Sequence, residues 1–525
     1  MIEPLAVLVL ALTACVFAVL IPFASHRTFL LVQSHRRRNE IRRPFSDTEL
    51  PVVTVQLPMF NERSVAARVV DATCRLDYPF DRLEIQVLDD STDGTSDIVE
   101  ERVAHWRAQG VDIRHLRRAD RSGFKAGALA LGTEVAQGEF ILILDADFVP
   151  PPTLVRDLLP PMRDEGVGMV QGAWAHLNRE ASWLTTAQAY LLDGHFLFEQ
   201  GGRYAGGRFF NFNGTAGLWR RRCLEDAGGW QSDTLTEDLD LSYRAQMRGW
   251  RFAYLDDVRV PAEIPETVTA LEVQQRRWAQ GGVQTGRKIL PVLLRGDFPL
   301  GVKVEAVVHL LGHMAHPFTL ALAVLLFPSA VARRSLGLES LLGLDVLLFT
   351  AATIPFAVFY WLAAEKRGHP RRGRVRDVLR TLALGIGLSV PVSRAVTRGL
   401  TNVADPFVRT PKRGGGTSMY RAKTMPWDTA AKLGMGALMA TYLVMAVAGG
   451  YWGQIPFIVL FLCGYLALGL PALRDRLSGR TVPGLETEHD EEGDPKGRPR
   501  QRRLRPFAGL LIPGQAEVAD ECEAA

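Results

Sequence analysis

The run Phe140-Ile-Leu-Ile-Leu-Asp-Ala-Asp147 is apolar for five residues and then ends in two carboxylates. An uninterrupted apolar run is typical of a parallel strand that is buried on both faces, because a strand with one face in water alternates apolar and polar residues. Ligands of open α/β sheets bind at the carboxyl ends of the strands. The run therefore predicts a central strand that carries Asp145 and Asp147 at the ligand-binding edge of a sheet.

Short β-branched runs and amphipathic stretches alternate around this strand, from Pro51 to about Asp297. Val52–Leu57 and Ile85–Leu88 are the clearest further strands. This rhythm is that of βαβ units, so the sequence predicts an α/β domain with a mostly parallel sheet.

Asp145-Ala-Asp147 offers two hard oxygen donors at one strand end. Oxygen ligands at this spacing suit Mg²⁺ or Mn²⁺, either of which would also bind a diphosphate and neutralise its charge. A solvated acidic turn has the same composition. Because a second acidic turn follows another strand, we favour the metal site.

That second turn, Asp89-Asp90-Ser-Thr-Asp-Gly94, follows the strand Ile85–Leu88. Asp90 could accept hydrogen bonds from a nucleotide base or ribose, although an ordinary Asx turn closed by Gly94 has the same residues. Lys125, in Ser-Gly-Phe-Lys-Ala-Gly, could pair with phosphate or lie on the surface. Two strand ends would then direct polar groups toward one crevice.

A third acidic motif, Thr236-Glu237-Asp238, precedes a helix-like pattern. One interpretation is structural, with the threonine as a helix cap and the acidic residues facing the helix dipole. The other is catalytic, with a carboxylate that takes a proton from an attacking hydroxyl group.

Gln274, Arg277 and Trp278 are spaced so that they share one face of a helix. An aromatic plane beside a guanidinium and an amide can stack on a sugar and hydrogen-bond to its neighbours. Tryptophan and arginine are also common where an amphipathic helix meets a membrane. The two interpretations are compatible.

Five apolar stretches are predicted to cross a membrane: Leu5–Phe23, Lys303–Val331, Leu341–Ala364, Asp428–Gly450 and Ile455–Leu470. The run Leu379–Val392 is shorter and has arginines at its borders, so we expect an interfacial amphipathic helix there. With the N-terminus outside, the basic segments Arg36–Arg43, Lys366–Arg376 and Arg409–Lys423 all fall on the cytosolic side.

These features predict four parts. We expect a membrane anchor with a basic juxtamembrane segment (residues 1–46), a cytosolic α/β domain (47–297), transmembrane and interfacial helices (298–475) and a disordered cytosolic tail (476–525).

Composition excludes several other classes of protein. The formal net charge of +4 is small and the basic residues lie beside apolar runs, which argues against a nucleic-acid partner. The five cysteines show no zinc or CxxC spacing. The carboxylates concentrate outside the predicted spans, unlike those of a transporter.

The acidic turns, Thr236-Glu237-Asp238 and Gln274-x-x-Arg277-Trp278 together, in this order, resemble the processive family-2 glycosyltransferases typified by cellulose synthase and hyaluronan synthase. Residues 212–217, 235–244 and 274–282 are similar in more detail to cellulose synthase-like mannan and glucomannan synthases and their bacterial relatives. Phe407–Gly414 is similar to the gating loop of cellulose synthase. The resemblance implies an α/β nucleotide-sugar-binding domain of the GT-A type, joined to an α-helical transmembrane domain.

By this resemblance, Asp90 would bind the nucleoside of a nucleotide-sugar donor. Asp145 and Asp147 would hold the diphosphate and the metal, Mg²⁺ or Mn²⁺. Lys125, assigned to phosphate above, would complete the donor site.

The resemblance further implies that Asp238 is the general base, and that Gln274, Arg277 and Trp278 hold the acceptor end. We thus expect inverting transfer of a hexose from GDP-mannose or UDP-glucose to a growing β-glycan, by a multi-pass protein of the cell inner membrane with a cytosolic catalytic domain. One alternative is a non-processive enzyme that adds a single sugar to a lipid, since ceramide glucosyltransferases share Gln-x-x-Arg-Trp. A catalytically inactive membrane protein is the other.

Overall fold

The computed structural model describes residues 2–36, 43–401 and 426–477. Four predicted features lie wholly or mainly outside these residues: the basic segments Arg36–Arg43 and Arg409–Lys423, the loop Phe407–Gly414 and the C-terminal tail. The helices and strands below belong to the described residues.

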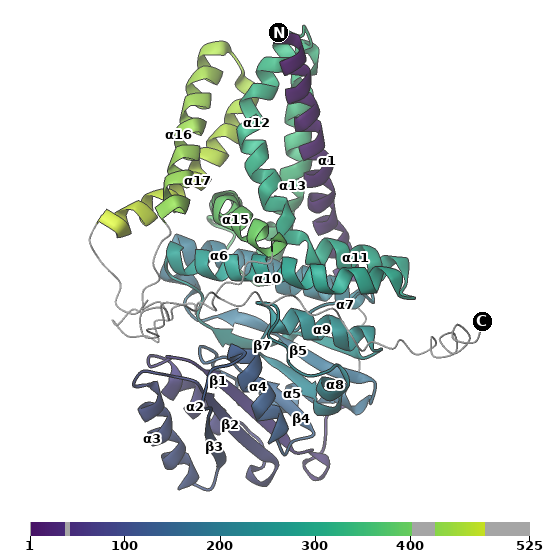
Figure 1. The fold of residues 1–525 in the computed structure, drawn as a ribbon, viewed down its shortest axis with the longest axis vertical. Helices are drawn as coiled ribbons and strands as arrows, with labels where there is room; N and C mark the ends of the chain where they lie inside the picture. The colour runs from purple at the N-terminus through teal and green to yellow at the C-terminus, as the bar shows by residue number, and fades with distance from the viewer. Residues whose placement is uncertain (1, 37–42, 402–425, 478–525) are drawn as a thin grey trace, which may run out of the picture.

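A seven-stranded sheet forms the layer farthest from the long apolar helices (Figure 1), with the strand order β3-β2-β1-β4-β6-β5-β7. Its strands are β1 (Val53–Met59), β2 (Leu83–Asp89), β3 (Asp112–Arg117), β4 (Phe140–Ile143), β5 (Val167–His176), β6 (Gly217–Arg220) and β7 (Arg251–Ala262). The pairs β1–β2, β1–β4, β2–β3 and β5–β7 are parallel, whereas β6 is antiparallel to β4 and β5. The predicted α/β class with a mostly parallel sheet is confirmed.

Strand β4 is buried on both faces, as its apolar run predicts. Phe140 and Leu142 belong to one hydrophobic core, and Ile141 and Ile143 belong to the core on the other face. Because neither face meets water, every position of this strand accepts an apolar side chain.

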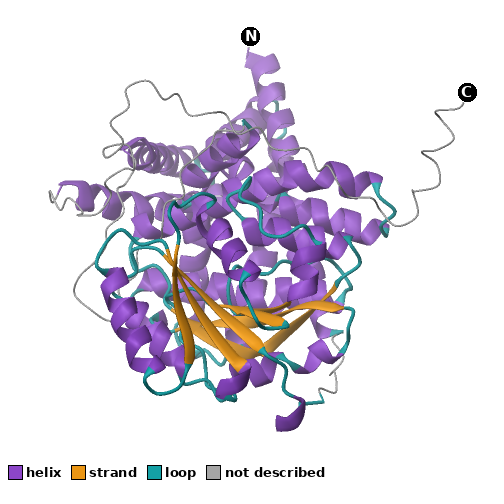
Figure 2. Ribbon diagram, turned by 60° about the horizontal axis from the view of Figure 1, so that its bottom comes forward, coloured by secondary structure: helices purple, strands orange, loops and turns teal. Residues whose placement is uncertain are grey.

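Helices cover both faces of the sheet (Figure 2). One core receives side chains from α2 (Ala66–Cys74), α3 (Thr95–Arg107) and α5 (Leu154–Leu158). The other receives them from α4 (Phe124–Glu134), α8 (Arg221–Asp226) and α9 (Glu237–Met247). The carboxyl ends of β1 and β4 remain open between these layers.

A layer of helices that lie across the long axis separates the sheet from the apolar helices (Figure 1). It contains α6 (Trp183–Gly194), which continues through a π-helix (His195–Gln200) into α7 (Gly201–Ala205), together with α10 (Val268–Arg295) and α11 (Leu300–Leu310). Residues 296–299 are not helical and separate α10 from α11.

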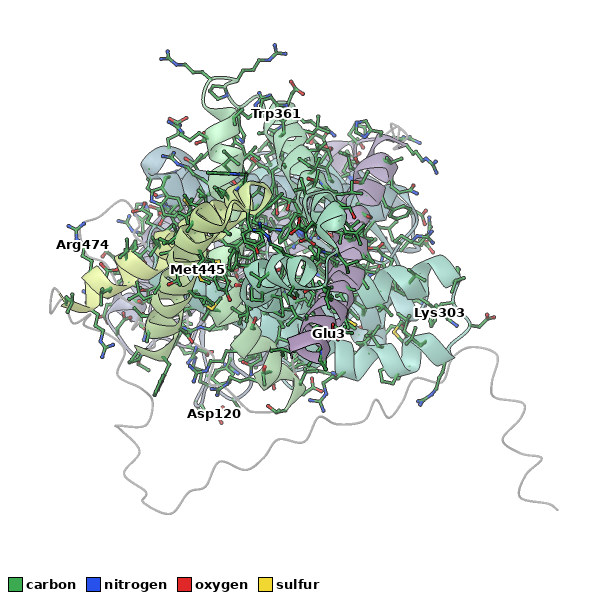
Figure 3. The ribbon with its side chains drawn as sticks, turned by 90° about the horizontal axis from the view of Figure 1, so that it is seen from above. Glu3, Asp120, Lys303, Trp361, Met445 and Arg474 are labelled. Carbon is green, nitrogen blue, oxygen red and sulfur yellow. The ribbon has the colours of Figure 1, made fainter. Side chains whose placement is uncertain are left out.

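Five segments of the described chain are long and apolar enough to cross a membrane: Glu3–His35, Gly312–Ser335, Glu339–Lys366, Pro426–Gly449 and Trp452–Leu477. They correspond to α1 (Ile2–His35), α12 (Ala315–Ser335), α13 (Leu342–Lys366), α16 (Pro426–Gly449) and α17 (Ile455–Leu477). Viewed from above (Figure 3), Met445 of α16 and Lys303 of α11 lie on opposite sides of the molecule, with Glu3 of α1 between them.

The predicted span Lys303–Val331 is wrong at its start. The structure divides it into α11 and α12 at Leu311, and only the part from Gly312 onward qualifies as a span. Gly312 is a poor helix former, and Pro317 has no N–H with which to bond the preceding turn. Hydropathy alone does not predict that the helix ends between α11 and α12.

The predicted single helix Leu379–Val392 is also wrong. It is two helices, α14 (Arg374–Gly387) and α15 (Ser389–Leu400), bent by 43° at Leu388. Pro391 cannot donate a hydrogen bond to Gly387 across the bend. The bent pair fits either a broken span, which would make six crossings instead of five, or a re-entrant segment, which would leave the number at five.

Helix α1 continues 12 residues beyond the predicted end at Phe23. His26 Nε2 lies 2.8 Å from Glu305 Oε2, and Arg27 forms an ion pair with Glu199. These two polar residues, which follow the predicted span, therefore join α1 to the layer that contains α11 and the π-helix.

Candidate active site

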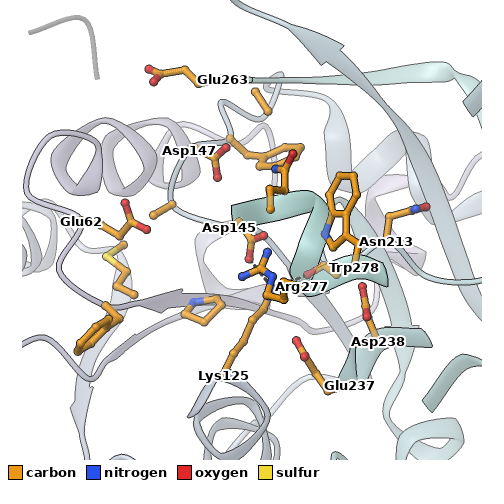
Figure 4. A pocket seen from close by; sticks show the side chains of 18 of the residues that line it. Glu62, Lys125, Asp145, Asp147, Asn213, Glu237, Asp238, Glu263, Arg277 and Trp278 are labelled. Atoms are coloured by element: carbon orange, nitrogen blue, oxygen red, sulfur yellow. Dashed lines mark hydrogen bonds and ion pairs between the residues drawn. The ribbon is translucent and has the colours of Figure 1, made fainter. Parts of the chain in front are cut away.

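One cavity is lined by every residue to which the sequence analysis assigns a donor, metal, catalytic or acceptor role. Its lining includes Asp90, Lys125, Asp145, Asp147, Asp238, Gln274, Arg277 and Trp278. In Figure 4, Lys125, Asp145 and Arg277 lie near the centre, with Glu237 and Asp238 to one side of them. Motifs up to 188 residues apart in sequence (Asp90 to Trp278) thus meet at one place.

Asp145 and Asp147 follow β4, which places both at the sheet edge. Asp145 Oδ1 lies 2.5 Å from Lys125 Nζ, and the Asp145 N–H donates to Thr215 Oγ1 at 2.9 Å. Asp145 is partly open to the cavity, whereas Asp147 is 6% exposed. The pair presents two hard oxygen ligands at different depths of one cavity.

Asp145 and Asp147 could bind a divalent metal only if the phosphates of the donor supplied further ligands. Among the described residues there is no group of three or more His, Cys, Asp or Glu side chains that could hold a metal ion unaided. Mg²⁺ is ordinarily bound by one or two carboxylates together with substrate phosphates and water. The two aspartates are compatible with that ligand set.

Lys125 stands at the start of α4, where Gly123 adopts φ 74° and so turns the chain into the helix. Its Nζ donates to Asp145 Oδ1 and, at 2.8 Å, to the Gly214 carbonyl oxygen. Burial by itself would lower the pKa of Lys125, but the carboxylates of Asp145 and Glu237 raise it above its ordinary value. Lys125 is therefore a fixed cation at the cavity floor.

Asp89 and Asp90 have different surroundings. Asp89 is buried and accepts hydrogen bonds from Ser96 Oγ at 2.6 Å and from the Ser91 N–H at 2.9 Å. Asp90 lines the cavity and is held by both branches of the Arg118 guanidinium, with Nε 2.9 Å from Oδ1. Of the two acidic residues, Asp90 alone lines the cavity.

Asp238 lies in the first turn of α9 and next to Gly214. A Cβ atom on Gly214 would come within 3.0 Å of Asp238 Oδ2, and this glycine has φ 79°. Burial, reinforced by the charge of Glu237, raises the pKa of Asp238 to about 7, although Lys125 opposes the rise. A carboxyl group that titrates near neutral pH is well matched to proton transfer.

Thr236 occupies the N-cap position of α9, but its hydroxyl does not cap the helix. Of the two interpretations of this motif, the one in which the threonine caps the helix is therefore wrong. Thr236 Oγ1 lies 3.2 Å from Thr285 Oγ1 on α10 instead. The motif is joined to α10, and its acidic residues are left facing the cavity.

Helix α10 contacts the cavity on one face and helix α16 on others. Gln274, Arg277 and Trp278 line the cavity, as their spacing predicts. On other sides of the helix, Arg276 Nη1 lies 3.1 Å from Asp428 Oδ2 and Glu272 forms an ion pair with Lys432, both on α16. The cavity wall is thus connected directly to an apolar helix.

The motifs did not reveal several other cavity residues. Phe60 follows β1, and the Arg121 guanidinium lies 3.2 Å from the centroid of its ring. Trp174 also lines the cavity, as does Asn213, which belongs to the similar segment 212–217 but received no site role from the sequence. Phe60 follows a strand end, the same signal that identified Asp90 and Asp145, whereas nothing local in the sequence marks Arg121.

Comparisons with known proteins match the part of the chain that contains this cavity. A family model described as "Glycosyltransferase like family 2" matches residues 51–281. The probable glucomannan 4-beta-mannosyltransferase 7 of Oryza sativa subsp. japonica is 45% identical over 258 residues, which are 48% of this chain and 44% of that protein. Glucomannan 4-beta-mannosyltransferase 2 of Arabidopsis thaliana is 44% identical over 253 residues, 47% of each chain. The chain therefore spans about half the length of these curated relatives.

Among solved structures, a mannosyltransferase from Pyrobaculum calidifontis, in complex with GDP-Man and Mn²⁺, is similar over 70% of this chain and 98% of that one. Its TM-score is 0.48 and its sequence identity 24%.

Proposed function

We propose that residues 51–281, which match the family model described as "Glycosyltransferase like family 2", form a nucleotide-sugar-binding domain of the GT-A type, and that the protein transfers a hexose from a nucleotide sugar to the growing end of a β-glycan at a membrane. One observation carries the proposal: the candidate donor, metal, catalytic and acceptor residues all line a single cavity. In this cavity the carboxyl group of Asp238, with a pKa near 7, lies beside the ammonium group of Lys125 and the strand-end pair Asp145 and Asp147.

The proposed reaction is a direct displacement. An acceptor hydroxyl oxygen bonds to the anomeric carbon while the bond from that carbon to the diphosphate breaks, and the nucleoside diphosphate leaves with the electron pair. Asp238 takes the proton of the hydroxyl, which is general-base catalysis. Attack on the face opposite the leaving group inverts the α-linkage of the donor to a β-linkage.

The donor side of the cavity would stabilise the leaving group. Asp90 would receive the nucleoside, and Lys125 would pair with the diphosphate. Asp145 and Asp147 would hold a divalent metal, Mg²⁺ or Mn²⁺, which neutralises charge on the diphosphate when bound. On the acceptor side, Trp278 would stack on the terminal sugar while Gln274 and Arg277 hydrogen-bond to it.

The donor we propose first is GDP-mannose, with UDP-glucose second. The names of the relatives favour a mannosyl group, since they are glucomannan 4-beta-mannosyltransferases. Transfer of a single sugar to a lipid remains the alternative function, because α10 both lines the cavity and forms ion pairs with the apolar helix α16, beside which a lipid acceptor could also enter.

We further propose that the protein is a multi-pass protein of the cell inner membrane, with its catalytic domain (47–297) in the cytosol. The anchor (1–46), the membrane region (298–475) and the tail (476–525) complete this division. The five apolar spans and the break between α10 and α11 support it.

The test is product formation by the purified protein in liposomes, supplied with labelled GDP-mannose or UDP-glucose in parallel. We expect label from one donor in a polymer that an endo-β-glycanase degrades. Label in a single-sugar lipid product would favour the alternative function. No transfer from either donor, with correctly folded protein, would contradict the proposal.

A further inference from the structure

The face of α10 that lines the cavity continues beyond it. Residues at helical steps of three and four follow Gln274 and Trp278 along the same side of the helix. We name four of them the docking stripe: Gly281, Gln284, Thr285 and Lys288. Each contacts the segment of residues 231–240, which contains Thr236-Glu237-Asp238.

The closest approach in the docking stripe is at Gly281. A Cβ atom there would lie 2.5 Å from Thr236 Cγ2, 2.7 Å from Thr236 Oγ1 and 3.0 Å from the Thr236 backbone nitrogen. Thr236 has a short β-branched side chain with little freedom to move aside. Glycine is therefore required here for α10 to pack against the backbone just before Glu237 and Asp238.

Hydrogen bonds fix the register of this contact. Gln284 Oε1 accepts from the Leu235 N–H at 3.0 Å, and the hydroxyls of Thr285 and Thr236 lie 3.2 Å apart. Thr285 is fully buried and Gln284 is 7% exposed. A shift of the segment along α10 would leave these buried polar groups without partners, which is unfavourable because they would lose water without gaining a hydrogen bond.

An ionic contact completes the docking stripe one turn further on. Lys288 Nζ lies 2.9 Å from Asp233 Oδ1 and 2.9 Å from Asp240 Oδ1, and it donates to Gln231 Oε1 at 2.7 Å. The side chains of Lys288 and Asp240 are 2% and 0% exposed. A buried lysine shared by residues on both sides of Asp238 holds this segment at two points.

From these contacts we propose that the docking stripe sets the position of Asp238 relative to the residues of α10 that hold the acceptor. This inference rests on the proposed function, in which Asp238 is the base and Gln274, Arg277 and Trp278 hold the acceptor sugar. Since one rigid helix carries both the acceptor site and the docking stripe, base and acceptor hydroxyl keep a fixed separation. The residues of the docking stripe are positioning residues, because they act through Asp238.

The chain offers a matched pair of glycines for the test. Gly281→Ala places a methyl group against Thr236, whereas a Cβ atom on the adjacent Gly282 meets no atom closer than 3.5 Å. Both changes add the same group to the same helix. Thr285→Val, which removes a buried hydroxyl while keeping the shape, serves as a second variant if Gly281→Ala does not fold.

The measurement compares sugar transfer to a glycan acceptor with hydrolysis of the same donor by water. Mobile water can follow a displaced carboxylate, but a sugar held on α10 cannot. We expect Gly281→Ala to lower transfer roughly 10- to 100-fold, with hydrolysis changed less than about threefold and donor KM unchanged. Gly282→Ala should behave as the wild type does.

Adding Thr236→Ala should relieve the clash, so that the double variant transfers better than Gly281→Ala alone. Equal losses of transfer and hydrolysis, or no difference between the two glycine variants, would overturn the inference while leaving wild-type transfer intact. Failure of the wild type to transfer any sugar would instead contradict the proposed function.

Discussion

The charge of Glu237 beside Asp238 leads to a prediction about pH. Burial is the first cause that raises the pKa of Asp238 to about 7, and the Glu237 carboxylate is the second. The base must be ionised to take a proton, so kcat/KM should rise as the pH rises through about 7. Glu237→Gln removes the neighbouring negative charge, stabilises the ionised form of Asp238 and should move this rise to lower pH.

The size of the effect depends on how far the pKa of Asp238 falls when the charge of Glu237 is removed. The ordinary value for aspartate is 3.8, so the total elevation amounts to about 4 kcal/mol. We expect loss of the Glu237 charge to lower the pKa of Asp238 by roughly one unit, which corresponds to about 1.4 kcal/mol. At pH 6 the ionised fraction of Asp238 would then increase about fivefold, whereas at pH 8.5 it would barely change.

The assay is initial-rate transfer from pH 5 to 9 at donor concentrations well below KM, so that kcat/KM reports the free enzyme. Glu237→Asp keeps the charge and serves as the control. An acid limb near pH 4 in the wild type, or a limb near pH 7 that Glu237→Gln leaves in place, would refute the assignment of this titration to Asp238.

Three further outcomes are expected. Asp145→Ala, Asp147→Ala or excess chelator should abolish transfer without preventing membrane insertion; full activity in chelator would contradict the metal site. Lys432→Met should lower stability by about 3–5 kcal/mol, because Glu272 is left buried and unpaired, and adding Glu272→Gln should restore part of the thermal midpoint in detergent. Protease added from the cytosolic side of oriented membranes should cleave within residues 51–297, and cleavage solely from the outer side would overturn the proposed topology.

The strands and the motif residues could be predicted because their signals are local. An apolar run such as Phe140–Leu144 identifies a buried strand by itself. The rule that ligands bind at carboxyl ends of strands then brings Asp90 and Asp145 together without knowledge of any contact. The spacing of Gln274, Arg277 and Trp278 likewise requires only the period of a helix.

Other features depend on contacts that hydropathy does not describe. The bend between α14 and α15 lies where Gly387 packs on α17, since a Cβ atom there would come within 2.4 Å of the Gly464 carbonyl oxygen. Helix α1 extends past Phe23 because His26 and Arg27 find carboxylates far away in sequence. Thr236 has the sequence of a cap but bonds to α10. In each case tertiary packing outweighs the local preference.

The measurement that tests the central claim most directly compares turnover with donor binding in Asp238→Asn. Loss of a general base typically costs about 100- to 10,000-fold in rate while ground-state binding persists. We therefore predict that Asp238→Asn binds labelled donor with the wild-type Kd but transfers sugar at least 100-fold more slowly. Weak donor binding together with a normal rate at saturation would contradict this account, because Asp238 would then be a donor ligand and Glu237 the first candidate for the base.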